Sequence, residues 1–237
     1  MSNTANYIDN TSYQTTPAYC AKEEYANTVI HLFGVVLSII GLCFLIINST
    51  DNIDVADTNA ASNALRIACF SIYGASLIIL FASSSLYHST NNIALKKLFK
   101  LFDHCAIYIL IAGTYTPLLL VSLKGPVGYW AAGLIWLIAI GGLTFKITTR
   151  HSKTPQKYKA ISLTTYLGMG LISVTLLGEL YKVLPIEALF FLAGGGVIYC
   201  IGVFFYVQKK VRFTHAIWHA FVLAAAVCHF LMIYLYV

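Results

Sequence analysis

Apolar residues gather in seven long runs that cover most of the chain, and polar residues gather in the short segments between them. The runs span residues 27–47, 65–86, 104–123, 129–147, 160–180, 186–207 and 215–237. Each run is close to the roughly 20 residues that a helix needs to cross the hydrocarbon core of a bilayer. The pattern therefore predicts seven transmembrane helices.

The alternative membrane architecture, a β-barrel, requires strands in which apolar and polar residues alternate. The runs do not alternate: residues 77–81, for example, read Leu-Ile-Ile-Leu-Phe. Composition agrees with buried helices, because 59% of the residues are hydrophobic and only 10% are charged, whereas soluble domains carry about 25% charged residues. We therefore predict an all-α integral membrane protein built as a seven-helix bundle.

The polar segment at the start of the chain, residues 1–24, is rich in Asn, Thr and Tyr. It lacks the basic and apolar regions of a cleaved secretory signal, so we expect a short polar tail. Residues 25–237 then form one transmembrane domain, and the length of the chain leaves no room for a soluble domain beside it.

Basic residues predict the orientation of the bundle, because short cytoplasmic loops retain Lys and Arg during insertion. Twelve of the fifteen fall on one side in an alternating topology: Lys22, Lys96, Lys97, Lys100, Lys146, Arg150, Lys153, Lys157, Lys159, Lys209, Lys210 and Arg212. We therefore expect a multi-pass protein of the cell membrane with its N-terminus in the cytoplasm and its C-terminus outside. The net charge of +6 is explained by the anionic inner leaflet, so no nucleic-acid partner is expected.

Polar and ionisable side chains recur at the predicted cytoplasmic ends of four helices. They are Glu24, Asn27 and His31 where the first helix opens, Ser84 and His88 at the end of the second, Asp103 where the third opens, and His215 and His219 where the seventh opens. Such groups are costly within a membrane unless they pair with one another or bind something. Their shared depth indicates a common site near the cytoplasmic face.

Three of these residues suit a metal ion. His215 and His219 lie four residues apart on one helical face, and His88 supplies a third imidazole from another helix. Three imidazoles with an open fourth position are typical of catalytic zinc, which lowers the pKa of its water towards about 7. We therefore predict Zn²⁺ held by His88, His215 and His219, with Asp103 handling a proton.

Three further residues, where the first predicted helix opens, would support these ligands. We expect Glu24, Asn27 and His31 to hold the ligand rings in place from behind. Ser84 is expected to hydrogen-bond Asp103 or a developing oxyanion. His229 is too far along its helix to share the ion, since it lies about 21 Å from His215, and a separate polar contact is expected for it.

The same residues carry a resemblance to a known family. The segments are Glu23-Glu24-Tyr25-Ala26-Asn27 followed by His31, Ser84-Ser85-Leu86-Tyr87-His88, Asp103-His104, Gly113-Thr114-Tyr115-Thr116-Pro117, and His215-Ala216-Ile217-Trp218-His219. In their order and spacing they resemble the haemolysin III family. That family belongs with the progestin and adipoQ receptors and is distantly similar to the alkaline ceramidases.

The resemblance implies a seven-helix fold with zinc near the cytoplasmic side. It maps the family's Ser-x3-His onto Ser84 and His88, its acidic residue onto Asp103, and its His-x3-His onto His215 and His219. It also implies a function, because the ceramidase-like relatives hydrolyse an amide of a sphingolipid. We therefore expect a zinc-dependent, ceramidase-like hydrolase that cleaves an amide or ester of a membrane lipid.

Two other functions remain open at this stage. One is a non-catalytic sensor or regulator of membrane lipid, in which the zinc is structural and the lipid is a ligand. The other is a cytolytic, pore-forming haemolysin, although no run has the continuous polar stripe that would line a water-filled pore. The sequence is compatible with a homo-oligomer and sets no oligomeric state.

Overall fold

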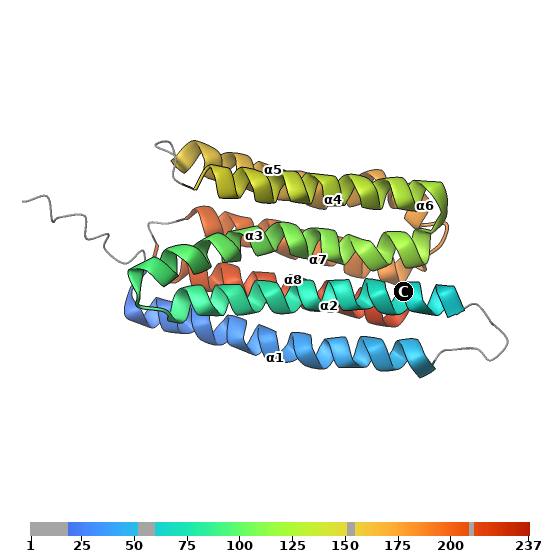
Figure 1. The fold of residues 1–237 in the computed structure, drawn as a ribbon, viewed down its shortest axis with the longest axis horizontal. Helices are drawn as coiled ribbons and strands as arrows, with labels where there is room; N and C mark the ends of the chain where they lie inside the picture. Colours follow the sequence, from blue (N-terminus) through green and yellow to red (C-terminus); the bar gives the residue numbers. More distant parts are fainter. Residues whose placement is uncertain (1–18, 52–59, 151–154, 209–210) are drawn as a thin grey trace, which may run out of the picture.

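The computed structural model describes residues 19–51, 60–150, 155–208 and 211–237, and in these residues it contains helices and no strands. The long helices are α1 (Ala21–Asp51), α2 (Ala60–Ser89), α3 (Ile93–Pro117), α4 (Gly125–Thr148), α5 (Pro155–Thr175), α7 (Ile186–Val207) and α8 (Thr214–Tyr236) (Figure 1). A π-helix, η1 (Leu118–Leu123), continues α3, and a single turn, α6 (Leu177–Leu180), follows α5. The prediction of an all-α protein is confirmed for the described residues.

Six segments of this part of the chain are long and apolar enough to cross a membrane: α1, α2, α3 with η1, α4, α7 and α8. The chain is therefore a multi-pass membrane protein. The helix α5, which covers most of the predicted fifth run, is not among the six, because its first half carries Lys157, Lys159 and Ser162. A seventh span, and the side on which each terminus lies, stay predictions.

Local sequence explains how the third helix begins and ends. Asn92 caps α3, because its side-chain oxygen accepts hydrogen bonds from the backbone N–H groups of Ala94 and Leu95, as a helix start requires. At the other end, Pro117 has no N–H to donate to the preceding turn. The chain there changes from α-helical to π-helical geometry, so the helical register changes at Pro117.

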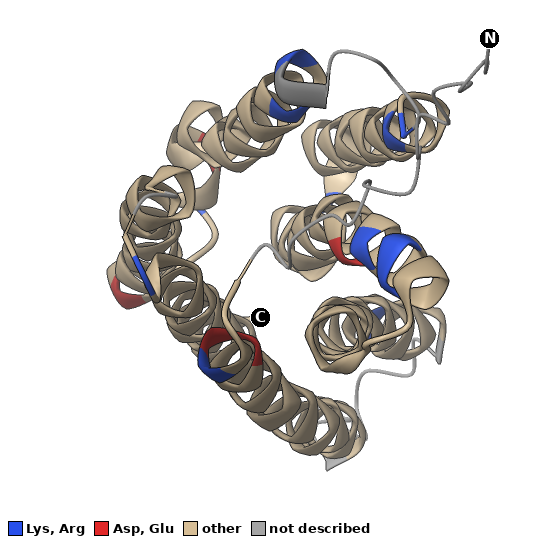
Figure 2. Ribbon diagram, turned by 90° about the vertical axis from the view of Figure 1, so that its left-hand side faces the viewer, with Lys and Arg blue, Asp and Glu red and all other residues tan. Residues whose placement is uncertain are grey.

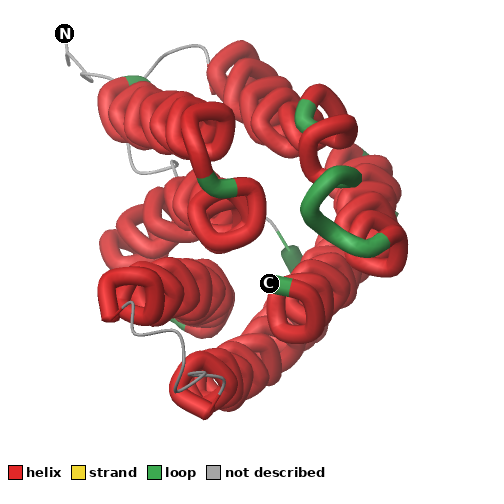
Figure 3. Tube along the Cα trace, turned by 90° about the vertical axis from the view of Figure 1, so that its right-hand side faces the viewer, coloured by secondary structure: helices red, strands yellow, loops and turns green. Residues whose placement is uncertain are grey.

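The most extensive packing joins α1 to α2, α2 to α3, α3 to α4 and α7 to α8, and α1 also packs against α8. Seen end on, the helices stand around a ring (Figures 2 and 3). The start of α1, the end of α2, the start of α3 and the start of α8 all meet at one end of the bundle (Figure 1). Lys and Arg mark several helix ends in the view from that side (Figure 2).

The helix α5 is attached to its neighbours by polar contacts. The Tyr115 hydroxyl of α3 lies 3.0 Å and 2.9 Å from the carbonyl oxygens of Met169 and Gly170, and it accepts the N–H of Ser173 at 2.7 Å. The Tyr166 hydroxyl donates in turn to a backbone carbonyl of α3 at 2.8 Å. These contacts compensate for the limited apolar surface of α5.

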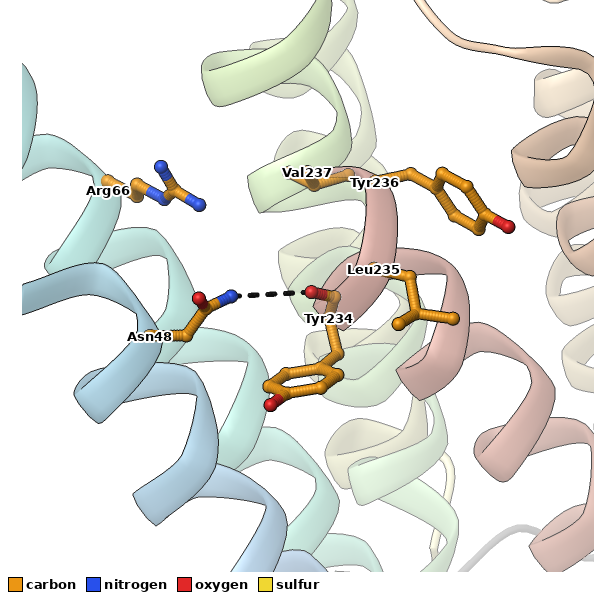
Figure 4. Close-up of a pocket in the computed structure, with 6 residues that line it drawn as sticks. All are labelled: Asn48, Arg66, Tyr234, Leu235, Tyr236 and Val237. Atoms are coloured by element: carbon orange, nitrogen blue, oxygen red, sulfur yellow. Dashed lines mark hydrogen bonds between the residues drawn. The ribbon is translucent and has the colours of Figure 1, made fainter. Parts of the chain in front are cut away.

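The end of the bundle remote from the start of α1 contains a cavity of about 400 Å³. It is lined by Asn48, Arg66, Tyr234, Leu235, Tyr236 and Val237 (Figure 4). The Asn48 amide donates to the carbonyl oxygen of Tyr234 at 3.4 Å, which joins α1 to α8 here. None of the predicted site residues lines this cavity.

Candidate metal centre

Three histidines from two helices meet at the end of the bundle where α1 begins. One ring nitrogen each of His88, His215 and His219 lies within 4.8 Å of the other two. His88 is on the last turn of α2, and the other two open α8. The exposed fractions are 3% for His88, 9% for His215 and 3% for His219, so the rings are shielded from solvent.

The start of α8 places two of these rings on one face. The ring centroids of His215 and His219 are 4.4 Å apart, as expected for residues one turn apart. Phe213, just before the helix, has a left-handed backbone with φ 63°, which is uncommon for a residue with a side chain. The Thr214 hydroxyl donates to the carbonyls of Gln208 and Val211 at 2.7 Å and 3.0 Å, which fixes the connection from α7.

The donor atoms fit a divalent metal ion. Nε2 of His219 lies 3.1 Å from Nε2 of His88, close to the roughly 3.4 Å between two imidazole nitrogens on a tetrahedral zinc ion. Nε2 of His215 and Nδ1 of His219 are buried with no hydrogen-bond partner among the described residues. Buried polar atoms normally have a partner, so this cluster could hold a metal ion.

His88 is also contacted from behind by two residues of α1. Its Nδ1 lies 2.5 Å from Oε2 of Glu24 and 3.3 Å from Nδ2 of Asn27. The other Glu24 oxygen, Oε1, accepts a hydrogen bond from Nζ of Lys96 at 2.8 Å. A carboxylate that accepts a hydrogen bond from one nitrogen of a ligand imidazole fixes the tautomer of the ring. It also raises the basicity of the other nitrogen, which binds the metal.

His31 adds a fourth imidazole to the cluster. Its ring centroid lies 3.9 Å from that of His219, and its exposed fraction is 2%. Neither of its ring nitrogens has a hydrogen-bond partner among the described residues. His31 also packs edge-on against Phe81, so its ring lies between two other aromatic rings.

The two predicted catalytic residues lie beside the cluster, outside the group of three ligand atoms. Asp103 is on α3, with a side chain 16% exposed, and it interacts electrostatically with His88. The Ser84 hydroxyl is fully buried one turn before His88 and makes no hydrogen bond of ordinary geometry within the described residues. Their roles stay predictions.

His229 makes the separate contact that we expected. Its Nε2 lies 3.2 Å from the carbonyl oxygen of Leu192, which joins α8 to α7. It also lies against Gly195, where a Cβ would overlap its ring. The predicted separate polar contact of His229 is confirmed.

One aromatic residue at the cluster was not expected from the sequence. Tyr19 precedes α1, and its ring stacks on His215 with centroids 4.5 Å apart and an interplanar angle of 11°. Burial and the nearby Tyr87 raise the pKa of the Tyr19 hydroxyl, so the phenol stays neutral. No spacing rule connects a tyrosine in a polar tail to a histidine at the other end of the chain.

Comparison with known proteins gives a consistent assignment. The profile of the family described as "Haemolysin-III related" matches residues 19–230. The chain is 37% identical to "Hemolysin-3" of Bacillus cereus over 96% of this chain and 97% of that protein. It is 38% identical to "Hemolysin-3 homolog" of Bacillus subtilis (strain 168) over 92% and 96% of the two chains.

A human protein is similar as well. The chain is 32% identical to human "Monocyte to macrophage differentiation factor" over 90% of this chain and 84% of that protein. The similarity therefore extends through nearly all the described helices. The chain belongs to the haemolysin III family.

Proposed function

We propose that this protein is a zinc-dependent hydrolase that cleaves an amide or ester bond of a membrane lipid. The observation that carries the proposal is the convergence of His88, His215 and His219 within 4.8 Å, with Glu24 2.5 Å behind one of these rings. Three imidazoles with a carboxylate behind them are the donor set of catalytic zinc.

A zinc ion at these residues would supply Lewis acidity and a water that ionises near neutral pH. The side chains have separate tasks in this proposal. Glu24 accepts a hydrogen bond from the N–H at Nδ1 of His88, which keeps the proton on that nitrogen and leaves the lone pair of Nε2 for the metal. Asp103 takes a proton from the attacking water, whose oxygen forms a new bond to the carbonyl carbon. The bond from that carbon to the amide nitrogen or ester oxygen then breaks, and Asp103 gives the proton to the departing amine or alkoxide. Ser84 donates to the developing oxyanion.

The proposed location is the cell membrane, with the site near the cytoplasmic face and α5 as a seventh span. Two observations support it. Lys and Arg are frequent at the end of the bundle where the histidines lie (Figure 2), as expected for a cytoplasmic end. The α5 helix packs against α3 and α4, which would place it beside two spans. The substrate lipid would reach the site from the bilayer.

Metal content and turnover together test the proposal. We expect purified wild type to contain stoichiometric zinc and His219→Ala to lose it, as measured by elemental analysis. The matched control is His229→Ala, which removes another buried histidine of α8 and should keep the metal. Asp103→Asn should keep the metal and lose release of fatty acid from a membrane-lipid extract.

The outcomes separate the candidate functions. Wild type without metal would overturn the proposal, and so would equal metal in wild type and His219→Ala. Stoichiometric metal with no product from any lipid class would favour a non-catalytic sensor or regulator with structural zinc.

A second candidate is a cytolytic pore, which the name of the Bacillus cereus relative, "Hemolysin-3", favours. Against it, many Ser and Thr hydroxyl groups inside the described helices donate hydrogen bonds to their own backbone. Ser38 and Thr116, for example, donate to carbonyls four residues earlier at 2.7 Å and 2.8 Å, so they need no water. Ion leak across a planar bilayer that persists in His215→Ala would support the pore.

A further inference from the structure

The cavity of about 400 Å³ lies at the end of the bundle opposite the histidine cluster. Three helices line it: Asn48 lies near the end of α1, Arg66 near the start of α2, and residues 234–237 at the end of α8 (Figure 4). Cavities that bind small molecules are about 300–1,000 Å³ in volume. The space therefore suits a lipid headgroup or a small soluble molecule.

Arg66 brings a positive charge to this cavity. Its guanidinium points from α2 toward the end of α8 (Figure 4). The Nε–H group is buried and has no hydrogen-bond partner among the described residues. No carboxylate of these residues forms an ion pair with Arg66, and no Asp or Glu lines the cavity. Buried polar atoms normally have a partner, so the cavity offers a cation and a donor to an acceptor from outside this part of the chain.

Packing holds the guanidinium and the cavity wall in place. Cζ of Arg66 lies 5.4 Å from the ring centroid of Phe70, one turn further along α2, and Phe70 is fully buried. This contact occupies one face of the planar group and leaves its N–H edge available. On another wall, the Asn48 amide donates to the carbonyl oxygen of Tyr234 at 3.4 Å. The site is therefore preformed.

The positions of these residues place the cavity at the membrane interface. Asn48 directly follows the first apolar run, Arg66 is the second residue of the second run, and residues 234–237 end the last run. An arginine in an apolar span is costly unless it pairs or reaches the interface. A guanidinium binds a phosphate through two parallel N–H···O bonds, and lipid phosphates lie at this depth. Phosphate therefore matches both the charge and the position of Arg66.

We propose that Arg66 receives a phosphate group in this cavity, which belongs to a phospholipid headgroup or to a small soluble molecule. The site is separate from the metal centre, because about 33 Å of helix separates Arg66 from His88 on α2. It lies between the three helices whose opposite ends carry Glu24, His88 and His219. The inference does not depend on the proposed function, since Arg66 binds the ligand far from the histidines.

Equilibrium binding tests the inference. The probes are dioctanoyl phosphatidic acid and dioctanoylglycerol, which differ only in the phosphate. Microscale thermophoresis of the purified protein in maltoside micelles gives both affinities. We expect wild type to prefer the phosphate-bearing lipid by about tenfold or more, because the other lipid lacks the charge-assisted hydrogen bonds. Equal affinity of wild type for the two lipids would overturn the inference.

Substitutions at Arg66 test its part in this preference. Arg66→Met removes the charge and should abolish the preference, and a preserved preference would overturn the inference. Arg66→Lys keeps the positive charge but cannot offer two parallel N–H groups, so the preference should fall by about threefold or more. This variant decides the question if Arg66→Met does not fold, because a preference equal to that of wild type would exclude the paired contact.

The matched control is Lys124→Met, which removes a positive charge from an exposed position after η1, at the same end of the bundle. It should leave the preference unchanged. Equal loss in Lys124→Met and Arg66→Met would overturn the inference, because attraction between a basic surface and any anionic lipid would then suffice. His219→Ala should keep the preference although we expect it to lose the metal, and loss of the preference there would place the phosphate on the metal instead.

Competition separates the two sources of phosphate. The affinity of wild type for phosphatidic acid is measured again in excess inorganic phosphate. An unchanged affinity assigns the site to a phospholipid headgroup. An affinity reduced to that for dioctanoylglycerol assigns it to a soluble phosphate, and the calorimetric affinity for inorganic phosphate should then fall about tenfold or more in Arg66→Met. Equal binding of inorganic phosphate by wild type and Arg66→Met would overturn the inference.

Discussion

The carboxylate behind His88 offers a sharp test of how this protein tunes its metal affinity. Glu24 Oε2 lies 2.5 Å from Nδ1 of His88, and Oε1 accepts from Lys96 at 2.8 Å. Replacing Glu24 with Gln keeps the shape and removes the negative charge. The amide no longer stabilises a proton on Nδ1, so Nε2 of His88 becomes a poorer ligand. We expect zinc to bind more weakly.

The contact geometry sets the size of the effect. Carboxylates that hydrogen-bond a ligand histidine change metal affinity by about 10- to 100-fold when removed, which corresponds to about 1.4–2.8 kcal/mol. The distance is short and the Glu24 side chain is only 13% exposed, so solvent screening is limited. We therefore expect Glu24→Gln to fall within that range.

Competition against a chromophoric zinc chelator measures the affinity directly. The matched control is Lys96→Met, which removes the cation from the same carboxylate and leaves Glu24 in contact with His88. A partly exposed pair contributes about 0–1 kcal/mol, so Lys96→Met should change zinc affinity by less than about fivefold. A loss of zinc affinity in Glu24→Gln of less than about fivefold would refute the reasoning. Equal losses of zinc affinity in Glu24→Gln and Lys96→Met would refute it as well.

Three further variants test other contacts. Tyr19→Ala should release metal to a chelator up to about tenfold faster with unchanged stoichiometry, because the stack on His215 contributes about 0.5–1.5 kcal/mol; an unchanged release rate would exclude a covering role. Gly34→Ala should lower the melting temperature in detergent, since its Cβ would lie 2.6 Å from a buried Phe ring and overpacking costs about 1–3 kcal/mol. Gly133→Ala, where the space is open, should be neutral or stabilising by up to about 1 kcal/mol, and equal melting shifts would contradict the packing argument. Tyr115→Phe should cost about 1–3 kcal/mol and speed amide hydrogen exchange within α5; protection equal to wild type would show that the hydroxyl is dispensable.

The apolar runs predicted the helices, because a helix that crosses a bilayer needs a long run of apolar residues and such a run is visible in the sequence. The helix ends were harder to predict. The first helix begins at Ala21 and so includes Glu23 and Glu24 in its first turn, residues that we had placed in the tail. A helix can continue past the hydrocarbon core into the polar region, where hydropathy no longer marks it. The sequence predicted seven spans, whereas six segments of the described residues are long and apolar enough to cross a membrane, because α5 is only weakly apolar.

The site was predictable where spacing alone determines geometry. His215 and His219 are one helical turn apart, so their shared face followed from the sequence. Their meeting with His88 depends on how α2 packs near α8, and only the shared depth of the residues indicated it. The contacts of Lys96 with Glu24 and of Tyr19 with His215 have no periodic signal, because each depends on side chains that cross between separate segments.

The tethers on α5 have a consequence for how the protein is made. Its hydroxyl and carbonyl groups bond to Tyr115 and His104 of α3, and Ser162 accepts from Lys146 of α4. Both partner helices leave the ribosome before α5 does. On our proposal that α5 is a seventh span, its docking groups on α3 and α4 are therefore synthesised before it. Insertion of α5 would then be a cooperative step of biogenesis that depends on the earlier helices.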